Sequence, residues 1–198
     1  FKNNLSKIYC FLIACSFFVG CSGTTKKETT QDEVNNTQQA PSTISTIAFG
    51  SCSHETDEQI MWKPILQNQP DLWIWLGDNV YGDTQDMALL KKKYDRQKSN
   101  SDYQKLIQVT KVVGIWDDHD YGQNDAGKEY PKKKESRDLM FEFLDVPEDH
   151  EAWQREGGYT AWEFGEGNRR IKVLLLDARY FRDSLRKAPE ESKYRYLP

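Results

Sequence analysis

Four ionisable side chains in a row, Asp117 to Asp120, directly follow an apolar run that ends at Trp116. Carboxylates held this close repel one another, and the repulsion grows as the surrounding dielectric constant falls. A bound cation removes the repulsion, and so does full exposure to water. Because the preceding residues Ile115 and Trp116 are apolar, full exposure is disfavoured, and the pattern indicates a polar site at the end of a buried strand.

Two earlier apolar runs end in a similar way. Residues 44–50 are followed by Cys52, and residues 72–77 are followed by Asp78. Short apolar runs bounded by turn residues are typical of buried strands. Ligands of open α/β sheets bind at the carboxyl ends of the strands. We therefore expect Cys52, Asp78 and the acidic block to converge at one edge of a sheet.

The rest of the folded part alternates between helical and extended patterns, which indicates an α/β fold with a sheet flanked by helices. The run at residues 72–77 is continuous enough to predict a strand buried on both faces. Helical spacing is found near residues 60–69, over 86–108 and over 132–144, and the 86–108 region is expected to be largely exposed. Further strands are expected at 109–116, 159–164 and 170–176.

Each candidate residue also has a structural interpretation when it is considered alone. A single cysteine after a strand, such as Cys52, is commonly a small core residue. An aspartate after a strand, such as Asp78, commonly accepts hydrogen bonds from turn amides. Gly77 permits a sharp turn at this point, so that Asp78 and Tyr81 can face one site. These alternatives stay open for each residue taken separately.

The first 21 residues have the pattern of a bacterial lipoprotein signal peptide. Lys2 and Lys7 precede an apolar stretch that is too short to span a bilayer, and Gly20-Cys21 resembles the processing site at which the thiol of Cys21 is lipidated. The alternative is a buried core helix. Residues 22–43 are polar and predict a disordered tether. We therefore expect an exported protein that is lipid-anchored to a bacterial membrane on its periplasmic or cell-surface side.

The composition of the chain limits the classes of partner that it is expected to bind. The formal net charge of -4 gives no sign of the basic surface that nucleic-acid binding requires. With Cys52 as the one cysteine after residue 21, a disulfide framework is excluded from the folded part. We expect a monomer that acts on small molecules. An alternative is a surface lipoprotein that captures a ligand or glycan, with tryptophans stacking on sugars: Trp73, Trp75, Trp116, Trp153 and Trp162.

Three ordered segments together resemble the alkaline phosphatase D family of the calcineurin-like metallophosphatases over residues 45–183. They are Gly77-Asp78-x-x-Tyr81, Trp116-Asp-Asp-His-Asp120 and Leu176-Asp-Ala-Arg-Tyr-Phe-Arg182. The resemblance implies a metallophosphatase-like sandwich core flanked by helices. It also implies metal-dependent hydrolysis of phosphate monoesters or diesters.

The resemblance further implies a two-metal centre. Asp78 bridges both ions, and Cys52 and Tyr81 bind one of them as thiolate and phenolate. That donor set favours Fe(III), with Zn(II) as the second choice. Asp118 contributes to an oxygen-rich second position, which suits Ca(II), Mg(II) or Mn(II). Asn124 and Asp117 are further candidates for metal or substrate binding.

For catalysis, the resemblance places His119 opposite the leaving-group oxygen, with Asp120 or a neighbour fixing its ring. Asp177 and Arg179 are expected to support the site from behind, although Asp177 can simply cap a strand. The family completes its site with a Gly-Asp-x-His segment, and none follows Asp177 here. Residues 44–198 are therefore expected to be the N-terminal portion of such a domain, truncated at the C-terminus. The chain as given is therefore expected to bind metal poorly and to be weakly active or inactive, and a catalytically incomplete fragment is the alternative function.

Overall fold

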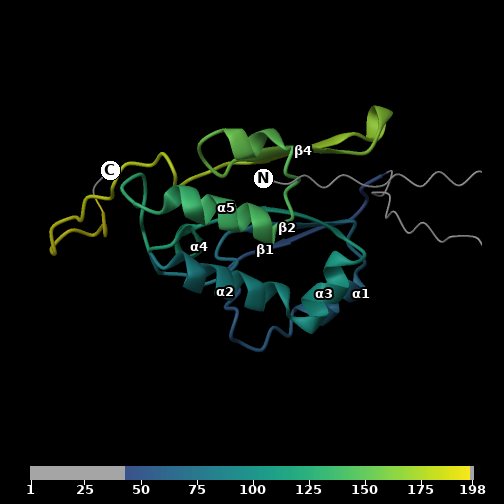
Figure 1. Ribbon diagram of the computed structural model, residues 1–198, viewed down its shortest axis with the longest axis horizontal. Helices are drawn as coiled ribbons and strands as arrows, with labels where there is room; N and C mark the ends of the chain where they lie inside the picture. The colour runs from purple at the N-terminus through teal and green to yellow at the C-terminus, as the bar shows by residue number, and fades with distance from the viewer. Residues whose placement is uncertain (1–42, 197–198) are drawn as a thin grey trace, which may run out of the picture. The chain divides into compact units, whose positions relative to one another are not determined.

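A computed structural model describes residues 43–196, and three parallel strands form its main sheet. The strands are β1 (Ile47–Gly50), β2 (Leu72–Leu76) and β3 (Lys111–Ile115), in the order β1-β2-β3 (Figure 1). In register, Phe49 lies opposite Ile74, and Ile74 lies opposite Val113. All three strands were predicted, and each is slightly shorter than its apolar run.

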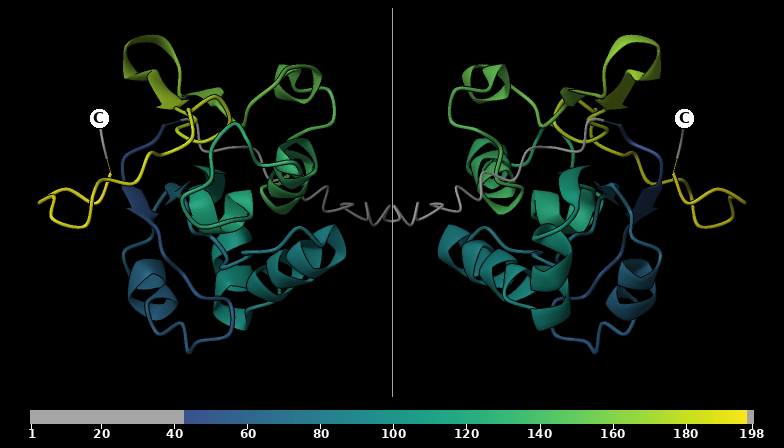
Figure 2. Two further views of the ribbon diagram at one scale, coloured as in Figure 1. Left: turned by 90° about the vertical axis from the view of Figure 1, so that its left-hand side faces the viewer. Right: turned by 90° about the vertical axis from the view of Figure 1, so that its right-hand side faces the viewer.

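Helices connect these strands, and they gather on one side of the sheet, with β1 at the outer margin (Figure 2). The helix expected over residues 86–108 is two helices. Asn100 separates them, because its side chain accepts hydrogen bonds from the amides of Asp102 and Tyr103 and so begins a new helix. The helices are α1 (Trp62–Gln67), α2 (Met87–Lys98), α3 (Ser101–Ile107), α4 (Asp118–Tyr121) and α5 (Lys133–Phe143), with 3-10 turns η1 (Glu151–Gln154) and η2 (Gly167–Arg169).

The core lies between the sheet and these helices, and Trp75 of β2 is at its centre. Its ring packs edge-on against Trp62 of α1 and Tyr103 of α3, and it also contacts Phe143 of α5. Gly114 on β3 leaves space for it, since a Cβ atom there would lie 2.6 Å from the Cβ of Trp75. The 86–108 region is less exposed than expected, with buried residues Leu90, Tyr94, Gln97, Tyr103 and Leu106.

The opposite face of the sheet is exposed along β1 and at the end of β2, whereas Leu72, Val113 and Ile115 on the same face are buried. Ile47, Phe49 and Leu76 alternate with the core residues, and their exposed fractions are 40%, 66% and 46%. The prediction that β2 is buried on both faces is therefore wrong at its carboxyl end. Apolar content alone does not distinguish a covered face from an open one, because both consist of the same residue types.

A second sheet pairs β4 (Thr160–Phe164) with β5 (Ile171–Leu175) as an antiparallel hairpin. The mixed architecture, a parallel sheet flanked by helices, confirms the predicted α/β class. No helix among the described residues is long and apolar enough to cross a membrane. The signal peptide, Cys21 and nearly all of the expected tether lie outside the described residues.

Candidate metal centre

The loops that follow the three strands are joined to one another by backbone hydrogen bonds. After β1, the amide of Cys52 donates to Gly77 O at 3.2 Å, and the amide of Ser53 donates to Asp78 O at 2.9 Å. After β2, the amide of Gly82 donates to His119 O at 3.1 Å. The carboxyl ends of β1, β2 and β3 therefore form one continuous edge, as the sequence predicts.

Asp120 fixes two of these loops to each other. Its fully buried carboxylate accepts hydrogen bonds from the amides of Asp78, Asn79 and Asp117, at 3.2, 3.1 and 2.7 Å. Burial raises the pKa of Asp120 well above its ordinary value, while the amides of Asn79 and Asp117 favour its ionised form. In this arrangement the carboxylate of Asp120 faces backbone amides of the β2 and β3 loops.

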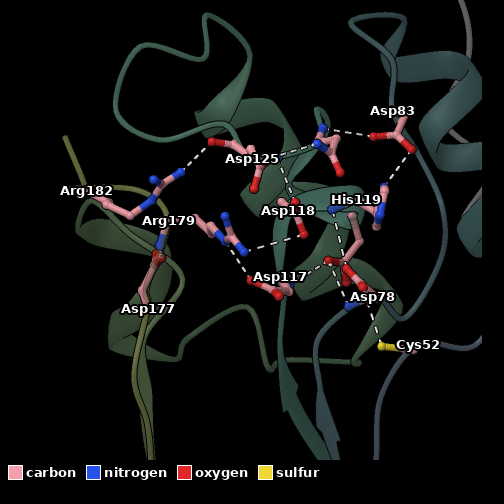
Figure 3. A network of polar contacts seen from close by, with 12 residues as sticks. Cys52, Asp78, Asp83, Asp117, Asp118, His119, Asp125, Asp177, Arg179 and Arg182 are labelled. Carbon is pink, nitrogen blue, oxygen red and sulfur yellow. Dashed lines mark hydrogen bonds and ion pairs between the residues drawn. The ribbon is translucent and has the colours of Figure 1, made fainter. Parts of the chain in front are cut away.

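A compact polar group forms where the loops meet. One ligand atom each from Asp78, Asp118 and His119 lies within 4.8 Å of the others, a geometry that can hold a metal ion. Cys52 lies beside this group, with its Sγ 3.5 Å from an Asp78 carboxylate oxygen (Figure 3). The thiol and the two carboxylates come from the segments that follow β1, β2 and β3, with Asp118 at the start of α4, so residues 52, 78 and 118 converge as expected.

The two carboxylates of this group are buried close to each other, which is unfavourable without a bound metal ion. Asp78 is 7% exposed and Asp118 is 8% exposed. Burial raises the pKa of Asp78, the nearby His119 opposes the rise, and the charges of Asp118 and Asp117 add to it. A cation between these groups would offset both the lost hydration and the mutual repulsion. The donor set therefore fits a metal ion.

Tyr81 projects into the same region. Its ring packs against His119 with the ring centroids 4.4 Å apart, and it also stacks on His54 at 5.0 Å. Burial, together with the nearby Cys52 and Asp78 side chains, raises the pKa of Tyr81 to about 12. Without a cation its phenol is therefore protonated at neutral pH.

The ring of His119 is oriented by Asp83. The Nδ1 atom of His119 lies 2.7 Å from a carboxylate oxygen of Asp83. The other oxygen of Asp83 accepts a hydrogen bond from the Asn124 amide at 2.9 Å. The side chain of Asn124 itself donates to Asp125 rather than to the Asp78 group. Asp83, rather than the expected Asp120, therefore orients the His119 ring, because the Asp120 carboxylate accepts from backbone amides instead.

Arg179 reaches the acidic block from the segment after β5. Its Nε lies 2.6 Å from Asp117, and an Nη lies 3.5 Å from Asp118 (Figure 3). Burial disfavours its charge, but the contact with Asp117 outweighs burial and raises the pKa of Arg179. The side chain of Asp177 behaves as a cap: it accepts from Trp116 Nε1 and from the amides of Gly158, Arg179 and Tyr180.

Sequence reasoning missed two aspartates of this region. Asp83 stands in the Gly77–Asp83 segment, and its position directly after Gly82 is the one available signal. Asp125 follows the acidic block, and its amide donates to Asp118 at 2.6 Å. Both have a left-handed backbone, with φ values of 44° and 59°. Such conformations are uncommon outside glycine and concentrate at functional sites.

Comparison with known proteins points to one fold. The chain is similar to a solved structure described as "Structure of PhoD", with a TM-score of 0.56 and 16% sequence identity. The match covers 75% of this chain and 35% of that chain. No protein-family model and no curated protein matches the sequence. This similarity shows that about three quarters of this chain shares an α/β fold with about a third of the PhoD structure.

Proposed function

We propose that this chain carries part of the active site of a metal-dependent hydrolase of phosphate monoesters or diesters. The observation that carries the proposal is the convergence of Cys52, Asp78 and Asp118 from three consecutive strand ends, with the His119 side chain next to the two carboxylates. The fold shared with PhoD supports the same reaction class. The resemblance of the three sequence segments is the independent line of support.

In this proposal Asp78 is the residue that two cations would share, because its carboxylate lies near both the thiol of Cys52 and the carboxylate of Asp118. Cys52 and Tyr81 supply soft and phenolic donors that suit Fe(III) on one side. The carboxylate of Asp118 would hold the second cation, and its oxygens suit Ca(II), Mg(II) or Mn(II). When bound, such cations supply charge that neutralises phosphate oxygens and favours deprotonation of the attacking water.

The protein side chains then orient the substrate and move a proton. The carboxylate of Asp83 holds Nδ1 of His119 at 2.7 Å. This contact leaves Nε2 as the nitrogen that exchanges a proton with the leaving-group oxygen. Arg179 neutralises the acidic block at Asp117 and Asp118, and it supports the site without contacting the reacting atoms.

We further propose that the protein is exported, and anchored to a bacterial membrane by a lipid on Cys21. Its substrates would then be small phosphate esters outside the cytoplasm, and it would act as a monomer. The glycan-binding alternative is less well supported, since Trp73, Trp75 and Trp116 are each at most 3% exposed and cannot stack on a sugar.

An assay with an aryl phosphate monoester and the matching diester tests the proposal. With Fe(III) and Ca(II) or Mn(II) supplied, the chain should hydrolyse at least one of them. Asp78→Asn should lower that rate by about 100-fold or more, because it removes the charge shared by both cations. Asp149→Asn, at an exposed aspartate after α5, is the matched control. Hydrolysis that survives Asp78→Asn unchanged would contradict the assignment. Metal binding without hydrolysis would favour the catalytically incomplete fragment.

A further inference from the structure

Glu55 and Lys93 form an ion pair, and both side chains also contact the backbone of Tyr81. A carboxylate oxygen of Glu55 accepts a hydrogen bond from the Tyr81 amide at 3.1 Å. The ammonium group of Lys93, on α2, donates to the Tyr81 carbonyl at 2.6 Å. The same ammonium lies 3.0 Å from the other oxygen of Glu55. One residue is thus held at both its N–H and its C=O by side chains of opposite charge.

Burial makes this arrangement energetically demanding. The side chain of Glu55 is 1% exposed, and that of Lys93 is 24% exposed. Removing a carboxylate from water is costly unless its oxygens are hydrogen-bonded and paired. Here both oxygens have partners. The hydrogen bond from the Tyr81 amide and the ion pair with Lys93 therefore compensate the buried carboxylate of Glu55.

The Glu55–Lys93 pair contacts Tyr81, and the ring of Tyr81 also packs against two histidine rings. His54, the neighbour of Glu55, stacks on the Tyr81 ring at an interplanar angle of 19°. His119 packs against the ring at 34°. The two imidazoles restrict the tilt of the phenol, and the ion pair fixes the peptide to which it is attached. The position of the phenol oxygen beside Cys52 and Asp78 follows from both constraints.

We propose that Glu55 and Lys93 are positioning residues that hold Tyr81 in place for binding a cation through its phenol oxygen. The inference rests on the proposed function, since it takes Tyr81 as a ligand. It also assigns a task to α2, which otherwise contributes no side chain to the polar group in the described residues. Residues that orient ligands from behind a metal site typically change metal affinity by about 10- to 100-fold.

Fe(III) binding to the full chain tests this inference, with two readouts: the dissociation constant and the visible phenolate-to-iron absorption per bound ion. Lys93→Met should weaken binding by about 10- to 100-fold and reduce the absorption. Lys93→Arg, which keeps the charge, should restore part of both. Lys92→Met is the matched control, because Lys92 is the neighbouring, exposed lysine of α2. It should leave both readouts unchanged.

The variants separate the two hypotheses. The positioning role is overturned, and the proposed function left intact, if Lys93→Met behaves like wild type in both readouts. This holds provided that wild type shows the phenolate absorption and Tyr81→Phe does not. No difference between wild type and Tyr81→Phe would instead remove Tyr81 as a ligand, and with it both ideas about this residue. If Lys93→Met does not fold, Glu55→Gln carries the same comparison, because it keeps an acceptor for the Tyr81 amide and loses only the charge.

Discussion

Cys52, Asp78, Asp83 and Asp125 share a left-handed backbone, with φ values of 58°, 49°, 44° and 59°. For residues with a Cβ atom this conformation costs on the order of 1–2 kcal/mol each. Asparagine and aspartate tolerate it best, so Cys52 is the least expected of the four. The strain turns these side chains toward the shared edge of the sheet. Its cost is acceptable where the side chain serves a site.

The strained backbone at Cys52 predicts that this residue favours metal binding at the expense of the stability of the metal-free chain. Cys52→Gly and Cys52→Ala both remove the thiol, but only glycine adopts the left-handed conformation without penalty. We expect the metal-free glycine variant to be roughly 0.5–1 kcal/mol more stable than the alanine variant. Urea unfolding in the presence of a chelator measures the difference. Both variants should bind Fe(III) more weakly than wild type; equal stabilities would show that the backbone at residue 52 is relaxed.

The phenol of Tyr81 makes metal binding depend on pH. Its pKa, raised to about 12, means that the phenol of the metal-free chain carries its proton throughout the neutral range. Binding as phenolate releases that proton, so this step strengthens the apparent affinity by about tenfold for each pH unit gained. Calorimetry in two buffers of different ionisation enthalpy counts the protons. Tyr81→Phe should release about one proton fewer; an unchanged count would mean that the phenol stays protonated.

At the scale of the elements, the loops after β2 and β3 leave no room between them. Gly77 has φ +104°, and a Cβ atom there would lie 2.5 Å from Asp117 Cβ and 2.6 Å from its backbone nitrogen. At Gly82, a Cβ atom would lie 2.8 Å from the carbonyl oxygen of His119. Two glycines thus permit the close approach that brings Asp78 to Asp118.

Gly77→Ala should therefore separate the loops. The side chain meets backbone atoms, which cannot rotate away, and the residue must also keep a positive φ. We expect a loss of about 2–4 kcal/mol in the free energy of unfolding, together with weaker metal binding. Gly167→Ala is the control, because it has φ +55° but meets nothing within 4 Å. A chemical denaturation series on both variants checks this: equal losses would mean that the two loops do not pack as closely as described.

The sequence predicts the secondary-structure elements, and the sheet edge at which the strands end, better than it predicts which side chains contact each other. The three strands and the convergence of Cys52, Asp78 and Asp118 follow from the position of polar residues after apolar runs. The contact between Asp83 and His119 does not, because it depends on how two loops approach in space. The same holds for Glu55 and Lys93, which are 38 positions apart. The break at Asn100 was readable as a helix cap, but the helical pattern on both sides concealed it.

At the scale of the molecule, an exposed apolar cluster lies on the main sheet, along β1 and at the end of β2. Ile47, Phe49 and Leu76 present apolar side chains to solvent on neighbouring strands. Exposed apolar clusters of this kind promote association. Phe49→Thr keeps a residue suited to a strand while removing the largest exposed side chain of the cluster.

We expect Phe49→Thr to lower the self-association of the chain at high concentration and the binding of a hydrophobic dye, with stability changed by less than about 1 kcal/mol. Sedimentation velocity and dye fluorescence measure the two effects. Val109→Thr, at an equally exposed apolar residue before β3, should change neither. If Phe49→Thr associates as strongly as wild type, the exposed apolar cluster does not drive association of this chain.

The most direct measurement is the location of a bound cation. A crystal of the chain soaked in Mn(II) should give an anomalous difference peak about 2–2.6 Å from carboxylate oxygens of both Asp78 and Asp118. The peak should vanish in Asp78→Asn crystals soaked in the same way. A peak only at surface carboxylates such as Asp149, or none at saturating Mn(II), would contradict a metal centre at the carboxyl ends of β1, β2 and β3.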